Sequence, residues 1–288
     1  MSTLVLIGGT GSLGSAILKH QELLKEKGVS RLRIISRDEQ KQEHLERHYQ
    51  GEIELQCFLG DVRNEERMHF ALEKADYVIH MAALKMIDRF ELDIEEGYET
   101  NINGTRNVMR AALEAKTLKS AIFVSTDKAC KPINAYGISK LAAERIWLWA
   151  NSFQKQTKFG VCLYGNVYGS RGSVVELWNK QKNQGELSVP LTDERMTRFF
   201  ILKRDASRFV LDSLFNNQSK VMIPEMKATK MTELLKAMDL KWHKIPIRPG
   251  EKLHEDIKTK EIEINSESAP HYTLEELREM NEAYLNGE

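Results

Sequence analysis

Tyr136 and Lys140 stand four residues apart in a segment with a helical pattern, so both side chains should lie on one face of a helix. An ammonium beside a phenol lowers the phenol pKa electrostatically, and it can also hold a nicotinamide ribose. A tyrosine tuned in this way can act as acid or base toward a sugar or alcohol hydroxyl. The spacing therefore predicts a proton-transfer site, although a helix with a core tyrosine and a surface lysine shares the pattern.

A short polar segment, Thr126-Asp127-Lys128, follows the apolar run 121–125 and precedes Tyr136. Open α/β sheets carry their chemistry at the carboxyl ends of the strands. Asp127 and Lys128 place an acid and a base side by side, either as reacting groups or as a salt bridge within the loop.

A glycine-rich turn separates the apolar run 4–7 from a helical pattern, and two spacings fit it, Gly9-x-Gly11-x-x-Gly14 and Gly8-x-x-Gly11-x-x-Gly14. Glycine allows a positive φ and a close approach to a pyrophosphate, and the helix start offers free N–H groups. A strand before the turn and a helix after it are the context of a dinucleotide-binding motif. The expected cofactor contacts here are Gly8, Thr10, Gly11, Ser12, Leu13 and Gly14.

The ends of the next strands bear on the choice of cofactor. Ser36 and Arg37 follow the second strand, where NAD-binding folds usually carry an acidic residue for the ribose 2′-hydroxyl. A hydroxyl and a guanidinium suit a 2′-phosphate better, which favours NADP over NAD, while Asp38 keeps NAD open. Further cofactor contacts are expected after the third and fourth strands, from Asp61, Val62, Ala82 and Ala83.

Short apolar runs alternate with longer amphipathic segments through the first 165 residues. This alternation predicts an α/β fold, a Rossmann-type doubly wound parallel sheet. The expected strands are Leu4–Ile7, Leu32–Ile35, Glu54–Phe58, Tyr77–Met81, Ala121–Ser125 and Phe159–Tyr164. The expected helices are Ser12–Lys27, Asp38–Tyr49, Asn64–Glu73, Glu95–Ala115 and Tyr136–Phe153.

After Tyr164, glycines and prolines punctuate shorter elements. We therefore expect residues 1–165 to form the cofactor-binding domain and residues 166–288 to form a smaller C-terminal substrate-binding lobe. The segment 199–215 is expected to return to the first domain. Near the end of the chain, Thr273 with Glu276 three residues later predicts a capping box at a helix start.

Composition argues against several classes of protein. The 42 Lys and Arg residues cancel the 42 Asp and Glu residues, and a neutral chain lacks the charge of a non-specific nucleic-acid binder. The apolar runs are far shorter than the roughly 20 residues of a membrane span. Three cysteines without a CxxC pair predict no disulfide framework and no zinc site, and His44 and His48 share a helix face without a carboxylate placed for a metal site. We expect a cytoplasmic protein.

The glycine turn together with Tyr136-x-x-x-Lys140 resembles the extended short-chain dehydrogenase/reductase family, which modifies nucleotide sugars. Further strings narrow the resemblance to the UDP-N-acetylglucosamine 4,6-dehydratases, in particular to the soluble, C5-inverting type that begins pseudaminic acid synthesis. Membrane-anchored relatives typically carry Met at the position of Tyr136. The resemblance fades beyond Glu255. The strings are Ala82-Ala83-Leu84-Lys85, Thr100-Asn101, Ser125-Thr126-Asp127-Lys128-Ala129, Tyr164-Gly165-Asn166-Val167, Gly169–Val174 and Arg248–Glu255.

The resemblance implies a hydro-lyase that oxidises C4, eliminates water across C5 and C6, and returns the hydride to C6, giving a UDP-2-acetamido-2,6-dideoxy-hexos-4-ulose. NADP would be regenerated in each turnover and would stay tightly bound. Tyr136, with Lys140 and Thr126, would serve the 4-hydroxyl. Lys128 would remove the C5 proton, and Asp127 would protonate the departing 6-hydroxyl. These roles require a raised pKa at Asp127 and a lowered pKa at Lys128.

The resemblance also implies a UDP-N-acetylglucosamine site that draws on several loops. Lys85 could reach the sugar, the diphosphate or the cofactor, and arginine side chains can pair bidentately with diphosphate oxygens. Each charged residue of the set could equally be a solvated surface residue. The expected substrate contacts are Lys85, Asn166, Arg171, Ser173, Thr192, Arg195, Arg198, and, at the uridine end, Arg248 and Glu251.

Two other functions stay open on the sequence. A UDP-sugar 4-epimerase or a reductase of the same family needs Tyr136 and Lys140 but no acid–base pair at Asp127 and Lys128. A catalytically silent NADP-binding regulator would typically lose the tyrosine or the lysine, and this chain has both. Family analogy implies a homo-oligomer that associates through helices 95–115 and 136–153.

Overall fold

The computed structural model describes residues 2–153 and 155–287. A seven-stranded sheet lies at the centre, with strand order β10-β6-β5-β4-β1-β2-β3 and parallel pairing throughout. Its strands are β1 (Ser2–Ile7), β2 (Val29–Ser36), β3 (Glu54–Leu59), β4 (Tyr77–His80), β5 (Ser120–Val124), β6 (Lys158–Cys162) and β10 (Val221–Met222). Because the strand order reverses on either side of β1, the sheet is doubly wound, and the predicted fold class is confirmed.

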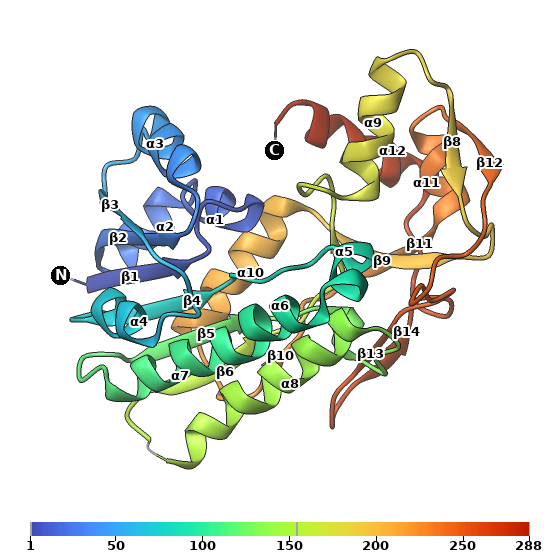
Figure 1. Cartoon of the computed structure of the whole chain (residues 1–288). Coiled ribbons are helices and arrows are strands. Elements are labelled where there is room, and N and C mark those ends of the chain that lie inside the picture. The colour runs from blue at the N-terminus through green and yellow to red at the C-terminus, as the bar shows by residue number, and fades with distance from the viewer. Residues whose placement is uncertain (1, 154, 288) are drawn as a thin grey trace.

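Helices cover both faces of this sheet, which explains the unbroken apolar runs of its strands (Figure 1). Every residue of β1 is buried, with Val5 and Ile7 in one apolar cluster and Leu4 and Leu6 in the other. On the first face lie α4 (Glu65–Leu72), α7 (Gly104–Glu114) and α8 (Ala135–Trp149). On the second lie α1 (Ser12–Ile17), α2 (Gln21–Glu26), α3 (Glu39–His48) and α10 (Lys203–Phe215).

Three helical segments differ from the expected pattern. The predicted helix 12–27 is divided between α1 and α2, because His20 leaves the helical conformation (φ −84°, ψ 45°) and its Nε2 pairs with the Ser207 hydroxyl of α10 at 2.8 Å. The predicted helix 95–115 contains a π-helical turn, Glu99–Asn103, between α6 (Ile94–Tyr98) and α7. A further helix, α5 (Ile87–Leu92), was not predicted.

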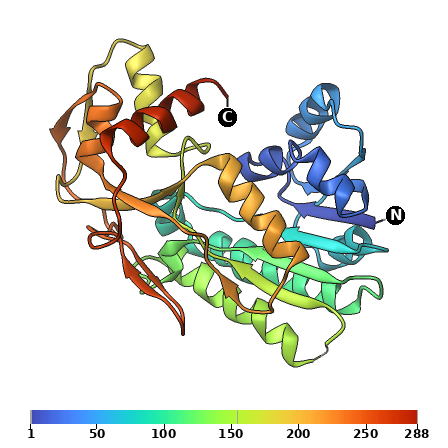
Figure 2. The same ribbon diagram turned by 180° about the vertical axis from the view of Figure 1, so that it is seen from behind.

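The C-terminal elements gather beyond the carboxyl edge of the main sheet, where Figure 2 shows them from behind. Trp178, Met196 and Leu277 lie in their shared apolar core. The strands are β7 (Asn166–Val167), β9 (Thr197–Ile201) and β11 (Lys227–Lys230) in one sheet, β8 (Ser188–Leu191) with β12 (Lys241–Lys244), and β13 (Asp256–Lys258) with β14 (Glu263–Asn265). The helices are α9 (Val174–Asn183), α11 (Met231–Ala237) and α12 (Leu274–Leu285).

The chain passes more than once between these two groups of elements. Within residues 199–215, β9 pairs in the small three-stranded sheet, whereas α10 packs against α1 and against β5 and β6 of the main sheet. Strand β10 then joins the edge of the main sheet beside β6. The division into domains at residue 165 stays a prediction.

Two smaller features complete the fold. The predicted capping box at α12 is confirmed, since the Thr273 hydroxyl accepts from the Glu276 backbone N–H and the Glu276 carboxylate accepts from the Thr273 N–H. Across residues 2–153 and 155–287, no helix has both the length and the apolar character that a bilayer crossing requires.

Candidate active site

A cleft of about 1180 Å³ opens at the carboxyl ends of the main-sheet strands. It brings together residues that are far apart in the sequence, from the glycine turn to the loop before β13. Most of the predicted site residues line it: Gly8, Thr10, Gly11, Ser12, Leu13, Gly14, Ser36, Arg37, Val62, Ala82, Ala83, Lys85, Thr126, Lys128, Tyr136, Lys140, Asn166, Arg171, Ser173, Thr192, Arg198, Arg248 and Glu251. Three predicted residues, Asp61, Asp127 and Arg195, do not form part of this lining.

The glycine turn has the shape that a close-approaching ligand requires. Gly8 has a φ of +84°, and a Cβ there would come within 2.7 Å of the Ala82 backbone nitrogen. A Cβ on Gly14 would come within 2.0 Å of the Gly9 carbonyl oxygen. Side chains at these positions would fill the cradle or force the turn apart. The turn therefore fits the pyrophosphate of a dinucleotide.

Cationic side chains gather beside the end of β2. Arg37 Nη1 lies 3.5 Å from Asp61 Oδ2, and the Ser36 hydroxyl accepts from the Gln42 amide at 2.9 Å. The Asp38 carboxylate accepts from the Lys41 backbone N–H at the start of α3 and also pairs with the Lys41 ammonium. The sequence reasoning missed Lys41, which lines the cleft as well.

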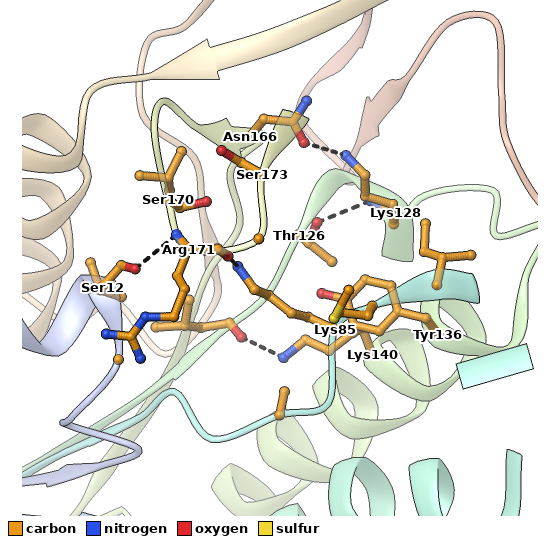
Figure 3. A pocket seen from close by; sticks show the side chains of 18 of the residues that line it. Ser12, Lys85, Thr126, Lys128, Tyr136, Lys140, Asn166, Ser170, Arg171 and Ser173 are labelled. Atoms are coloured by element: carbon orange, nitrogen blue, oxygen red, sulfur yellow. Dashed lines mark hydrogen bonds between the residues drawn. The ribbon is translucent and has the colours of Figure 1, made fainter. Parts of the chain in front are cut away.

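Lys85 and Arg171 tie opposite sides of the cleft together (Figure 3). The Lys85 ammonium donates to the Arg171 carbonyl at 2.7 Å, and the Arg171 N–H donates to the Ser12 hydroxyl at 3.1 Å. Burial lowers the pKa of Lys85, and the Arg171 charge lowers it further, while Glu176 acts in the opposite direction. The loop 169–173 is thereby attached to both the glycine turn and the loop after β4.

Asp127 and Lys128 form a buried ion pair at the end of β5. The Lys128 ammonium donates to Asp127 Oδ1 at 2.8 Å and to Asn166 Oδ1 at 2.8 Å, and the Thr126 hydroxyl donates to Asp127 Oδ1 at 3.0 Å. The Asp127 side chain is wholly buried, and among the described residues its Oδ2 has no hydrogen-bond partner. Burial raises the pKa of Asp127, against the opposing effect of Lys128.

The pKa of Lys128 is raised, whereas the proposed role of a base led us to expect a lowered one. Burial alone would lower it, but the carboxylates of Asp127 and Glu255 more than offset that effect. Glu255 Oε1 lies 3.5 Å from the Lys128 ammonium. The Asp127 carboxylate, together with this second carboxylate that the sequence reasoning gave no role, is the physical reason for the difference.

Tyr136 and Lys140 project from the first turns of α8, which Asn134 caps by accepting from the Gly137 N–H at 2.7 Å. Burial raises the pKa of Tyr136, the Asp127 charge raises it further, and a hydrogen bond with Thr126 opposes them. Lys140 does not lower it as expected. Its ammonium donates to the Val124 carbonyl at 2.7 Å and lies 3.9 Å from the centre of the Phe123 ring.

The environment of Lys140 nevertheless makes it an easily deprotonated amine. Burial lowers the pKa of Lys140 to about 7, although Glu144 one helical turn later acts in the opposite direction. Burial likewise raises the pKa of Glu144 to about 7, against the effect of its hydrogen bond from Ser125. A titratable pair therefore lies directly beneath the cleft, and its carboxylate was not anticipated from the sequence.

The predicted arginine contacts divide into three environments. Arg198 is buried, and its guanidinium donates to the Leu253 carbonyl at 3.0 Å and the Lys252 carbonyl at 2.7 Å. Arg248 lies near the cleft mouth, with Nη1 3.4 Å from Asp88 Oδ2. Arg195 is exposed and pairs with its neighbour Asp193, away from the cleft lining.

Lys252 and Glu255 also line the cleft. The sequence analysis gave neither of them a role of its own, although both belong to the segment 248–255 that carries the family resemblance. The one available signal was their place beside Arg248 and Glu251. Within the ranges 2–153 and 155–287, no group of three or more His, Cys, Asp or Glu residues is arranged to hold a metal ion.

Comparison with known proteins assigns this chain to a family. The model of the family described as "Polysaccharide biosynthesis protein" matches residues 4–276, which extends past Glu255. The chain belongs to this polysaccharide biosynthesis protein family. A family relative, the UDP-N-acetylglucosamine 4,6-dehydratase (inverting) of Campylobacter jejuni subsp. jejuni serotype O:2, is 41% identical over 257 residues, covering 88% of this chain and 76% of the relative.

Other similar proteins include different activities. A UDP-glucose 4-epimerase of Rickettsia bellii is 36% identical over 282 residues, which cover 94% of this chain and 81% of that protein. The solved structure of Pen from Bacillus thuringiensis has a TM-score of 0.88 at 28% identity, covering 99% of this chain and 98% of that one. DesIV, a dTDP-glucose 4,6-dehydratase from Streptomyces venezuelae, has a TM-score of 0.80 at 17% identity and is similar in fold.

Proposed function

We propose that this member of the polysaccharide biosynthesis protein family is a UDP-N-acetylglucosamine 4,6-dehydratase of the C5-inverting type. The observation that carries the proposal is the Asp127–Lys128 pair, joined at 2.8 Å. Lys128 lines the same cleft as Tyr136, and Asp127 is buried beside it. An elimination needs an acid and a base at one substrate, whereas an epimerisation at C4 needs only the tyrosine site. The 41% identity to the inverting dehydratase supports the same assignment.

Tyr136, Thr126 and Asp127 offer a route for the proton of the 4-hydroxyl. Tyr136 takes that proton as C4 is oxidised, and Thr126 is hydrogen-bonded both to Tyr136 and to Asp127. Asp127 protonates the departing 6-hydroxyl with the proton that it receives from Lys128. The proton lost at O4 passes afterwards through Tyr136 and Thr126 to Asp127 and restores the proton count of the pair. The raised pKa of Asp127, caused by its burial, suits an acid that must hold a proton.

Lys128 removes the C5 proton and later returns a proton to C5 from the face that inverts the centre. In the resting pair the raised pKa of Lys128 favours the protonated amine. Transfer of one proton along the 2.8 Å hydrogen bond to Asp127 converts the ion pair into a neutral amine and a neutral carboxylic acid. These are the base and the acid that the elimination needs.

NADP is our proposal for the cofactor, bound tightly through the glycine turn and the loop after β4. It supplies hydride acceptance from C4 and hydride return to C6. Arg37 and Lys41, with the Ser36 hydroxyl, would face the 2′-phosphate, because all three line the cleft at the end of β2. Asp38 supports NADP over NAD as well, since its carboxylate is engaged by Lys41 at the start of α3.

The remaining substrate contacts are also proposals. Lys85, Arg171 and Asn166 would hold the sugar and diphosphate, while Ser173, Thr192, Arg198, Arg248 and Glu251 would complete the nucleotide end. We further propose a homo-oligomer that associates through α7 and α8, acting in the cytoplasm in a pathway such as pseudaminic acid synthesis. A monomeric mass in sedimentation velocity would contradict the oligomer.

Replacement of Lys128 separates the dehydratase from the epimerase reading. Lys128→Ala should lower the dehydration rate by about 10²- to 10⁴-fold, the usual contribution of a general base, while the bound cofactor stays, because Lys128 does not contact the glycine turn. The control is Lys131→Ala, three residues later, whose ammonium is exposed and pairs with Asp256. Full dehydratase activity in Lys128→Ala, measured by product mass, would contradict the assignment.

A 4-epimerase is the second candidate, favoured by the 36% identity to the Rickettsia bellii enzyme over 94% of this chain. It would explain Tyr136 and Lys140 but would leave the buried Asp127–Lys128 pair without a role. An epimerase would keep its turnover in Lys128→Ala, so the same variant decides between the two functions.

A further inference from the structure

Glu255 is a buried carboxylate that contacts the proposed reacting pair without being part of it. The residue is 3% exposed. Its Oε1 lies 3.5 Å from the Lys128 ammonium and 3.8 Å from Arg198 Nε, and its Oε2 lies 3.7 Å from the Lys252 ammonium. Ser266 fixes its backbone, accepting from the Glu255 N–H at 2.8 Å and donating to the Glu255 carbonyl at 2.8 Å.

The Lys128 ammonium consequently sits between two carboxylates that come from distant parts of the chain. Asp127 is joined to it at 2.8 Å from the end of β5, and Glu255 approaches from the segment before β13. Among the described residues, the charged groups facing Glu255 are the cations of Lys128, Arg198 and Lys252 and, beyond Lys128, the carboxylate of Asp127. Burial alone would raise the pKa of Glu255, but these cations more than offset that effect, so its pKa is lowered and the ionised carboxylate is favoured.

A fixed negative charge at this place affects both reacting groups in the same direction. It favours the ammonium form of Lys128 and the protonated form of Asp127. It therefore keeps one proton available to the pair while leaving its transfer along the Asp127–Lys128 hydrogen bond possible. In the elimination, the C5–H bond breaks with its proton passing to Lys128, a C5–C6 double bond forms, and the 6-hydroxyl leaves with the Asp127 proton as water.

We infer that Glu255 is a positioning residue for this elimination, holding Lys128 beside Asp127 and keeping their shared proton in place. The inference rests on the proposed function for its catalytic meaning. The contact between Glu255 and Lys128 itself can be tested without any turnover.

The first test measures the proton affinity of Lys128 directly. The pH dependence of Lys128 acetylation by acetic anhydride, followed by peptide mass spectrometry, is compared in wild type and Glu255→Gln. Loss of the carboxylate should move the midpoint to lower pH by about one unit or more, the usual effect of a nearby opposite charge. The control is Glu263→Gln, a more exposed carboxylate on β14 that pairs with Lys131 and Lys258. An unchanged midpoint in Glu255→Gln would overturn the inference.

The second test measures dehydration. Glu255→Gln should lower kcat by about 10- to 100-fold, move the alkaline limb of its pH profile to lower pH, and enlarge the isotope effect with C5-deuterated UDP-N-acetylglucosamine. Glu255→Asp keeps the charge and should return the alkaline limb of the pH profile to its wild-type position. If Glu255→Gln lost activity only because it failed to fold, keeping the charge would not restore that limb. If Glu255→Gln has the wild-type rate and pH profile, the inference about Glu255 is overturned, whereas the proposed dehydratase function stands. An inactive wild type with a shifted Lys128 midpoint instead overturns the proposed function, and with it the catalytic role of Glu255, while the contact stands.

Discussion

At the scale of single residues, the site depends on the ionised forms of Asp127 and Lys128, which burial alone would disfavour. Asp127 is wholly buried and Lys128 is 16% exposed at the cleft, and both are held by each other and by neighbouring polar groups. Removing one member of such a pair leaves an uncompensated charge, which is costly in a buried environment. Burial raises the pKa of Asp127 in spite of Lys128, whereas the carboxylates of Asp127 and Glu255 raise the pKa of Lys128 in spite of burial.

Arg37 allows a test of cofactor choice at the same scale. Arg37→Ala should weaken NADP⁺ binding by about tenfold or more, the typical loss for one charged hydrogen bond, while NAD⁺ binding changes little. Binding of both cofactors to the apoprotein is measured by isothermal titration calorimetry. Arg47→Ala, on the outer side of α3 and paired with Glu43, serves as the control. Equal losses for NADP⁺ and NAD⁺ would argue against a 2′-phosphate contact.

At the scale of elements, the start of α8 sets the positions of Tyr136 and Lys140. Asn134 is the N-cap of this helix and also donates to the Gly250 carbonyl at 2.8 Å. It thereby joins the helix start to the loop that carries Arg248 and Glu251. A change at this cap should act on both sides of the cleft.

The cap can be tested against a matched cap elsewhere. Asn134→Ala should cost about 1 kcal/mol of stability, as N-cap removal usually does, and should also reduce turnover because the tyrosine and lysine lose their support. Asn64→Ala removes the equivalent cap of α4, where Asn64 accepts from the Arg67 N–H at 2.9 Å, and should cost similar stability with wild-type turnover. Urea unfolding and initial rates measure the two effects. Equal rates in both variants would contradict a positioning role for Asn134.

The elements of the first 165 residues were predictable because their signals are local. Buried parallel strands appear in the sequence as unbroken apolar runs, and the glycine turn is recognisable by its place between a strand and a helix. The break between α1 and α2 was not predictable, because it depends on His20 reaching Ser207, which lies far along the chain. Glu255 was missed for the same reason, since only the fold brings it to Lys128.

At the scale of the whole molecule, the cleft lies where the carboxyl edge of the main sheet meets the C-terminal elements. Figure 1 shows these two groups of elements next to each other. The main sheet supplies the proposed cofactor cradle and the Tyr136 site, and the later segments supply Asn166, Arg198 and Glu255. Neither group of residues alone assembles the acid–base cluster. The proposed chemistry therefore belongs to the folded chain as a unit.

The most direct test of the central proposal is incubation of the purified protein with UDP-N-acetylglucosamine and no added cofactor. The account predicts a product that has lost one water by mass spectrometry and is a 4-keto-6-deoxy sugar inverted at C5 by NMR. Turnover without added cofactor would also indicate that the cofactor is carried by the protein and regenerated. A product of unchanged mass, epimeric at C4, would contradict the dehydratase assignment and establish an epimerase instead.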